Sequence, residues 1–203
     1  MTLVANSIRW FILLTLTLSV TYSVLLGSWS TVFVIGLSLI LISIPVYLER
    51  RFGMQFSRRL KFWLMVFIFA TIFLGEVNSF YDDIWWWDSL WHFIAGLGLT
   101  TFGFVILTHI YNQTTLRSVP AMTSFFALCF SGLMIALWEI FEFSVDLLYF
   151  EKAKMQPSNY DSMIDMLLGI VASLIVCVLG FRYLKHKEKN FVSEIVETTS
   201  LTQ

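Results

Sequence analysis

Six long apolar stretches constrain this chain more than any other feature of its sequence. A helix crosses roughly 30 Å of hydrocarbon with about 20 apolar residues, and each stretch approaches or exceeds that length. The stretches lie near residues 8–27, 31–48, 61–78, 89–111, 121–148 and 162–184. Only 13% of the 203 residues are charged, whereas soluble domains carry about a quarter. We therefore predict an all-α membrane bundle, in which six transmembrane helices form a single domain over residues 1–185.

Basic and acidic side chains separate to opposite sides of the predicted spans. Eleven of the 13 Lys and Arg residues lie on one side: Arg9, Arg50, Arg51, Arg58, Arg59, Lys61, Arg117, Arg182, Lys185, Lys187 and Lys189. Ten of the 14 acidic residues lie toward the other side: Glu76, Asp82, Asp83, Asp88, Glu139, Glu142, Asp146, Glu151, Asp161 and Asp165. Because basic loops remain in the cytoplasm, we predict a multi-pass protein of the inner (cell) membrane with both termini cytoplasmic. Residues 186–203 are expected to form a flexible cytoplasmic tail.

Three short motifs place ionisable side chains at the outer ends of the last three predicted spans. They are Asp88-x-x-x-His92, Glu139-x-x-Glu142 and Asp161-x-x-x-Asp165. Spacings of three or four residues put both side chains of a motif on one face of a helix. Glu139 lies roughly 27 Å from the cytoplasmic start of its span, at about 1.5 Å per residue, so the three motifs share one depth. Ionisable groups at this depth face a bundle interior or a water-filled cavity and are candidates for function.

Small residues continue the helical faces that carry the motifs. They are Gly96 and Thr100 below His92, Gly169 and Ser173 below Asp165, and Ala136 and Gly132 below Glu139. Small residues let the backbones of membrane helices approach closely. We therefore predict that the acidic faces are also the packing faces and that the three motifs point toward each other.

Carboxylates gathered in one small site repel each other, and no Arg lies on the outer side to neutralise them. Bound cations, protonated carboxyl groups or side chains splayed into water would each relieve this repulsion. Carboxylates with one imidazole suit a divalent ion such as Mg, Mn, Ca, Fe or Zn, and paired helices build such sites in other bundles. We therefore predict a divalent metal ion as cofactor, with six ligand residues: Asp88, His92, Glu139, Glu142, Asp161 and Asp165.

Structural roles compete with the metal hypothesis. Asp88 and Asp161 lie near helix starts, where a carboxylate binds free N–H groups and meets the positive end of the helix dipole. The other four residues lie deeper, where capping does not apply. For His92, Glu139, Glu142 and Asp165 the alternative is a purely structural hydrogen-bond network.

The same motifs resemble those of uncharacterised bacterial inner-membrane proteins of the YjdF-like family. The shared pattern comprises Asp88, His92 and Phe93, then Glu139 and Glu142, then Gln156, Asp161, Asp165 and Met166. The resemblance covers roughly residues 80–175 and implies a shared six-helix architecture, without an activity. The chain departs from the family pattern at Trp91, where the family tends to have Gly, and at Pro157-Ser158, where Gly-Asp is frequent.

Three functions remain open. In the first, a metal-dependent hydrolase or transferase acts on a lipid or lipid-linked substrate at the outer leaflet, with His92, Glu139 and Glu142 as catalytic residues. In the second, the protein transports protons or cations, although the inner halves of the spans offer few polar groups and no inverted repeat is evident. In the third, the acids bind only a structural ion. Membrane lipids are the expected partners, and no nucleic-acid motif is present.

Overall fold

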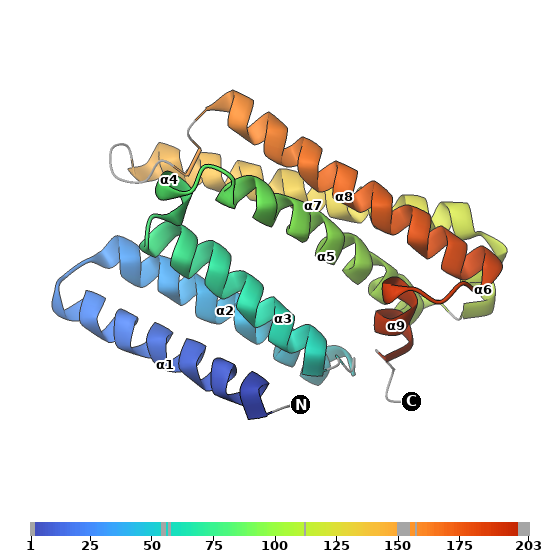
Figure 1. Ribbon diagram of the computed structural model, residues 1–203, viewed down its shortest axis with the longest axis horizontal. Helices are drawn as coiled ribbons and strands as arrows, with labels where there is room; N and C mark the ends of the chain where they lie inside the picture. Colours follow the sequence, from blue (N-terminus) through green and yellow to red (C-terminus); the bar gives the residue numbers. More distant parts are fainter. Residues whose placement is uncertain are drawn as a thin grey trace. The chain divides into compact units, whose positions relative to one another are not determined.

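The computed structural model describes residues 3–53, 56, 58–111, 113–149, 155, 156 and 158–198, and within these ranges all regular structure is helical (Figure 1). The helices are α1 (Leu3–Leu25), α2 (Trp29–Phe52), α3 (Arg58–Ile68), the π-helix η1 (Phe69–Val77), α4 (Phe80–Asp83), α5 (Trp87–Ile110), α6 (Gln113–Ser118), α7 (Pro120–Tyr149), α8 (Asn159–His186) and α9 (Phe191–Thr198). The all-α prediction is confirmed.

Five of these helices are long and apolar enough to cross a membrane. Their apolar spans are Asn6–Leu25, Trp29–Phe52, Trp87–Ile110, Pro120–Leu148 and Asn159–His186. The predicted span 61–78 corresponds to α3 and η1, whose apolar part Leu60–Gly75 falls in a shorter class of 10–17 residues. A π-helix places more residues in each turn than an α-helix, so this segment also covers less height for its length. Five membrane spans are therefore supported, and the sixth is not established.

The chain divides into two compact units, and the first extends to Trp87. Its core forms where α1, α2, α3 and η1 meet, around Ile12, Leu16, Ile35, Met65 and Phe73. Many large apolar side chains of α1 and α2 are exposed instead of joining this core. Such exposure is costly in water and is the pattern expected of helices that face lipid.

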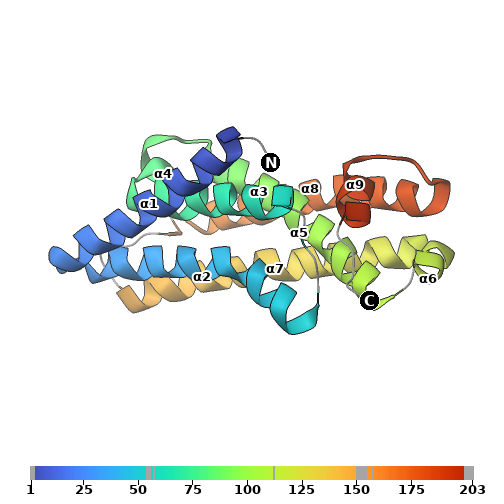
Figure 2. The same ribbon diagram turned by 90° about the horizontal axis from the view of Figure 1, so that it is seen from below.

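The second unit begins at Asp88 and contains three long helices, α5, α7 and α8 (Figures 1 and 2). A Cβ atom built on Gly96 of α5 would collide with the backbone carbonyl of Gly169 in α8. Farther along α8, Gly180 leaves room for the ring of Phe104. Since no side chain separates the backbones at Gly96 and Gly169, α5 and α8 approach closely at this point.

Two of the three predicted small-residue faces pack as expected. Gly96 and Thr100 of α5 are buried, as are Gly169 and Ser173 of α8. The hydroxyl of Ser173 donates to the carbonyl of Gly169 at 2.7 Å and lies 2.9 Å from the hydroxyl of Ser131 on α7. The hydroxyl groups of Ser131 and Ser173 are therefore satisfied within and between the helices.

The face predicted for α7 is wrong by about one residue. A Cβ atom on Gly132 would meet nothing within 4 Å. The buried residues below Glu139 are instead Ile135, Ser131 and Ala127, each four residues apart. The predicted face steps three residues from Glu139 to Ala136 and then four to Gly132. The packed side of α7 follows steps of four from Glu139, so the predicted face is offset by one residue.

The segment expected to be a flexible tail contains α9. Asn190 starts this helix, because its side-chain oxygen accepts hydrogen bonds from the backbone N–H groups of Val192 (3.0 Å) and Ser193 (3.2 Å). The amide nitrogen of Asn190 also donates to the carbonyl of Leu179 in α8 at 3.0 Å. Val192 and Val196 are 0% and 3% exposed. Residues 191–198 therefore form a helix packed on α8.

Candidate functional site

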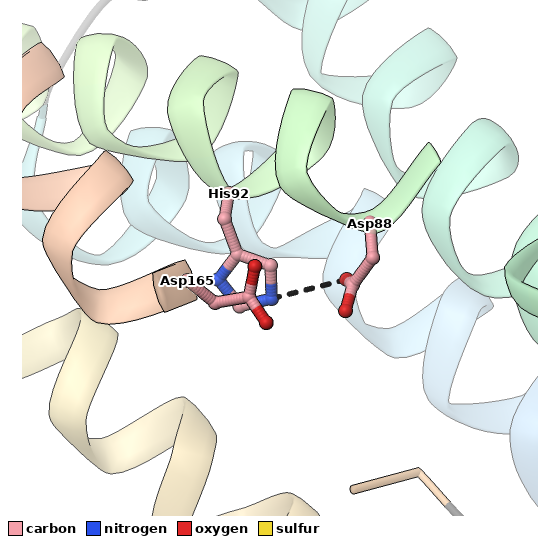
Figure 3. A group of neighbouring side chains, drawn as sticks. All are labelled: Asp88, His92 and Asp165. Carbon is pink, nitrogen blue, oxygen red and sulfur yellow. Dashed lines mark ion pairs between the residues drawn. The ribbon is translucent and has the colours of Figure 1, made fainter. Parts of the chain in front are cut away.

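His92 is the central residue of the candidate site. It lies one helical turn after Asp88 on α5, so both side chains share a face. Its Nε2 atom is 3.2 Å from Oδ1 of Asp88 (Figure 3). The side chain of His92 is only 9% exposed, whereas that of Asp88 is 27% exposed. The site is therefore buried at the imidazole and reaches the surface at Asp88.

The second imidazole nitrogen faces α7. Nδ1 of His92 lies 3.7 Å from Oε1 of Glu139, a residue that is 6% exposed. The other oxygen of Glu139, Oε2, accepts a hydrogen bond from the side-chain amide of Gln156 at 3.1 Å. Among the described residues, Oε1 has no hydrogen-bond partner. A buried carboxylate oxygen without a donor is costly, so Oε1 is the oxygen of Glu139 that is open to a further partner.

Glu142 lies on the same face of α7, three residues beyond Glu139. It is 9% exposed, and its Oε1 accepts a hydrogen bond of 2.7 Å from the indole nitrogen of Trp138. Trp138 precedes Glu142 by four residues, so one turn of helix brings donor and acceptor together. The indole is neutral, and the bond therefore orients the carboxylate without neutralising it.

The two aspartates of α8 have different surroundings. Asp165 is 3% exposed and lies beside the imidazole of His92 (Figure 3). Asp161 lies in the first turn of α8 and is only partly buried. Its backbone N–H donates to the hydroxyl of Ser158 at 3.1 Å, which makes Ser158 the N-cap of this helix.

Five of the six predicted ligand residues come together in two overlapping groups. In one group, ligand atoms of Asp88, His92 and Asp165 all lie within 4.8 Å of one another. In the other, ligand atoms of His92, Glu139 and Glu142 do so. His92 belongs to both groups, and Asp161 belongs to neither.

The distance between His92 and Glu139 suits two ligands of one metal ion. At 3.7 Å, Nδ1 and Oε1 are too far apart for a good hydrogen bond, which ends near 3.2 Å. Two metal–ligand bonds of about 2.1–2.3 Å that diverge by about 110–120° place their donor atoms roughly 3.4–4.0 Å apart. The observed separation falls within that range. The arrangement therefore fits a bound ion better than a direct contact.

The negative charge of the site also favours a bound cation. If Glu139 and Glu142 are both ionised at their separation of at most 4.8 Å, they repel by about 3.5 kcal/mol at an effective dielectric constant of about 20. Such repulsion exceeds the roughly 1 kcal/mol gained from a typical hydrogen bond. The ion pairs of Lys61 with Glu49 and of Arg182 with Glu188 lie elsewhere in the described part of the chain.

The structure adds residues to which the sequence analysis assigned no role. Both oxygens of Asp146 accept backbone hydrogen bonds, from Met155 at 2.8 Å and from Gln156 at 2.9 Å. These bonds fasten the segment before α8 to the end of α7, where Gln156 reaches Glu139. Asp146 lies seven residues after Glu139, two helical turns farther along the same side. The seven-residue spacing could have identified Asp146 from the sequence, and the place of Gln156 in the motif pattern could have identified Gln156.

Comparisons with known proteins agree with a membrane protein. The family model described as "Predicted membrane protein (DUF2238)" matches residues 8–186. An "Uncharacterized protein" of Thermotoga maritima is 26% identical over 140 residues, which cover 68% of this chain and 70% of the relative. No solved structure matches. These findings confirm the expected membership in an uncharacterised family of membrane proteins.

Proposed function

This chain belongs to the DUF2238 family of predicted membrane proteins, and from the geometry of its site we propose that it binds a divalent metal ion among α5, α7 and α8. The ligands are His92, Glu139 and Glu142. The observation that supports this most strongly is the buried Oε1 of Glu139, which lies 3.7 Å from the imidazole without a hydrogen bond among the described residues.

The roles of the two imidazole nitrogens follow from their neighbours. Nε2 lies 3.2 Å from a carboxylate oxygen of Asp88. When Asp88 is ionised, this oxygen accepts hydrogen bonds and cannot donate one. Nε2 therefore carries the proton, and Nδ1 presents its lone pair to the ion beside Glu139. Carboxylates that orient a metal-binding histidine in this way are usual in metal sites. Asp88 and Asp165 thus position His92, and Asp161 stabilises the start of α8.

The experiment that tests this proposal is metal analysis of the full chain purified in detergent. We expect one divalent ion per protein, and a loss of at least tenfold in occupancy for Glu139→Gln, since the remaining oxygen is a weaker ligand. Asp88→Asn should retain the ion with affinity lowered about 10–100-fold, as for other residues that orient a ligand. Equal occupancy in wild type and Glu139→Gln would refute the proposal.

A hydrolase or transferase is the activity that this coordination favours. Three protein ligands leave positions open for water and substrate, as in catalytic zinc sites, whereas structural sites are closed by four. A divalent ion would supply a Lewis acid and an activated water, and the exposed edge at Asp88 is the entrance. A lipid or lipid-linked substrate fits a site at the end of membrane helices. Ion-dependent release of a head group from vesicles distinguishes this activity from cation transport, which would instead appear as flux into proteoliposomes.

The orientation in the membrane makes a separate prediction. Single cysteines placed at 79–88 and at 155–160 should react with an impermeant reagent from outside the cell, because the basic loops hold the other ends of the helices inside. Cysteines placed at 49–53 and at 115–119 should react only after the membrane is opened. Labelling of 155–160 from the cytoplasmic side would place the His92 site at the inner surface instead.

A further inference from the structure

Gln156 makes a pair of contacts that bear on how Glu139 binds an ion. Its side-chain amide donates to Oε2 of Glu139 at 3.1 Å and to the backbone carbonyl of the same residue at 3.0 Å. On the basis of the proposed metal site, we propose that Gln156 is a positioning residue that restricts Glu139 to one coordinating oxygen and thereby selects smaller cations over Ca²⁺.

The hydrogen bonds of Asp146 hold Gln156 in place. One carboxylate accepts the backbone N–H groups of two successive residues, Met155 at 2.8 Å and Gln156 at 2.9 Å. These charge-assisted bonds are stronger than neutral ones. Because both the backbone and the side chain of Gln156 are bound to α7, the amide is fixed beside Oε2 and does not swing away when an ion enters.

Fixing one oxygen leaves the other to the ion. Oε2 of Glu139 is engaged by the amide, whereas Oε1 faces Nδ1 of His92. Ca²⁺ takes six to eight oxygen ligands and often binds a carboxylate through both oxygens, whereas smaller ions need fewer ligands at shorter distances. A carboxylate limited to one oxygen therefore disfavours Ca²⁺ relative to Mn²⁺.

Two variants remove the amide donor. Gln156→Ala deletes the side chain, and Gln156→Met keeps a similar length while losing both N–H donors and adding no charge. The measurement is titration calorimetry of the full chain in lipid nanodiscs with Mn²⁺ and, separately, with Ca²⁺. For both variants we expect the ratio of the Ca²⁺ to the Mn²⁺ dissociation constant to fall about tenfold, the lower range for a residue that orients a ligand.

Ser158→Ala is the matched control. Ser158 is exposed and caps α8 two residues beyond Gln156, so its loss should lower the melting temperature and leave the ratio unchanged. A wild-type ratio in both Gln156 variants, whatever their stability, would overturn this inference while leaving the metal site intact. Wild-type protein that binds neither ion would overturn the proposed function and the inference together.

Discussion

The substitution Glu142→Gln should abolish the stabilisation that a divalent ion gives to this protein. An ion at 100 times its dissociation constant stabilises the folded state by about 2.7 kcal/mol. Chelator should therefore lower the melting temperature of the wild-type protein in detergent, and added ion should restore it. In Glu142→Gln, neither chelator nor added ion should change the melting temperature. The amide oxygen can still accept the hydrogen bond from Trp138, observed at 2.7 Å, so the variant removes charge and keeps shape.

Without a metal ion, the order of the two melting temperatures should reverse. When Glu142 and Glu139 are both ionised with no ion between them they repel, and metal-free Glu142→Gln should then melt above metal-free wild type. Glu188→Gln is the control, because Glu188 pairs with Arg182 at the surface, 2.8 Å away, where an ion pair contributes at most about 1 kcal/mol. That variant should respond to chelator as wild type does. A chelator-insensitive wild type that is destabilised by Glu142→Gln would identify a structural hydrogen-bond network instead.

The substitution Gly96→Ala should disrupt the packing of α5 on α8. The new methyl group would collide with the backbone carbonyl of Gly169, and a backbone cannot rotate away as a side chain can. Overpacking of a closely packed interior costs about 1–3 kcal/mol, and we expect the upper end of that range. His92 and Asp165 lie four residues before the two glycines, so separation of the helices should also weaken ion binding. Thermal unfolding and metal titration measure the two effects.

Gly98→Ala provides the comparison on the same helix. A Cβ atom at Gly98 meets nothing within 4 Å. The helix should therefore gain up to about 1 kcal/mol from the higher propensity of Ala, and ion binding should stay as in wild type. Equal destabilisation by both substitutions would show that the close approach at Gly96 is not what holds α5 against α8.

Local rules predicted the helices and the convergence of the motifs. The lengths of the apolar stretches located five membrane spans, and spacings of three or four residues placed Asp88 with His92 and Glu139 with Glu142. Small residues correctly marked the contact of α5 with α8. These successes share one cause: each depends on residues within a turn or two of the same helix, where geometry follows from spacing alone.

The remaining features depend on choices that spacing does not determine. Whether Gly132 or Ser131 lies on the inward face of α7 depends on how the neighbouring helices pack against it. The π-helical turns of η1 result from a shift of backbone hydrogen bonds that no residue type announces. Helix α9 was not predicted, because the polar composition of the tail indicated flexibility and the capping role of Asn190 was not recognised. Gln156 meets Glu139 across 17 positions in the chain, beyond any periodicity.

The contact of Gly96 with Gly169 also determines what can vary at the candidate site. Backbone atoms act there as a fixed spacer, so at this point no side chain sets the separation of the helices that carry His92 and Asp165. Exposed positions such as Leu90 and Leu167 can therefore vary in sequence without changing that separation. If the proposed ion binds there, a change of preferred cation would proceed through the proposed ligand side chains and their hydrogen-bond donors, one residue at a time.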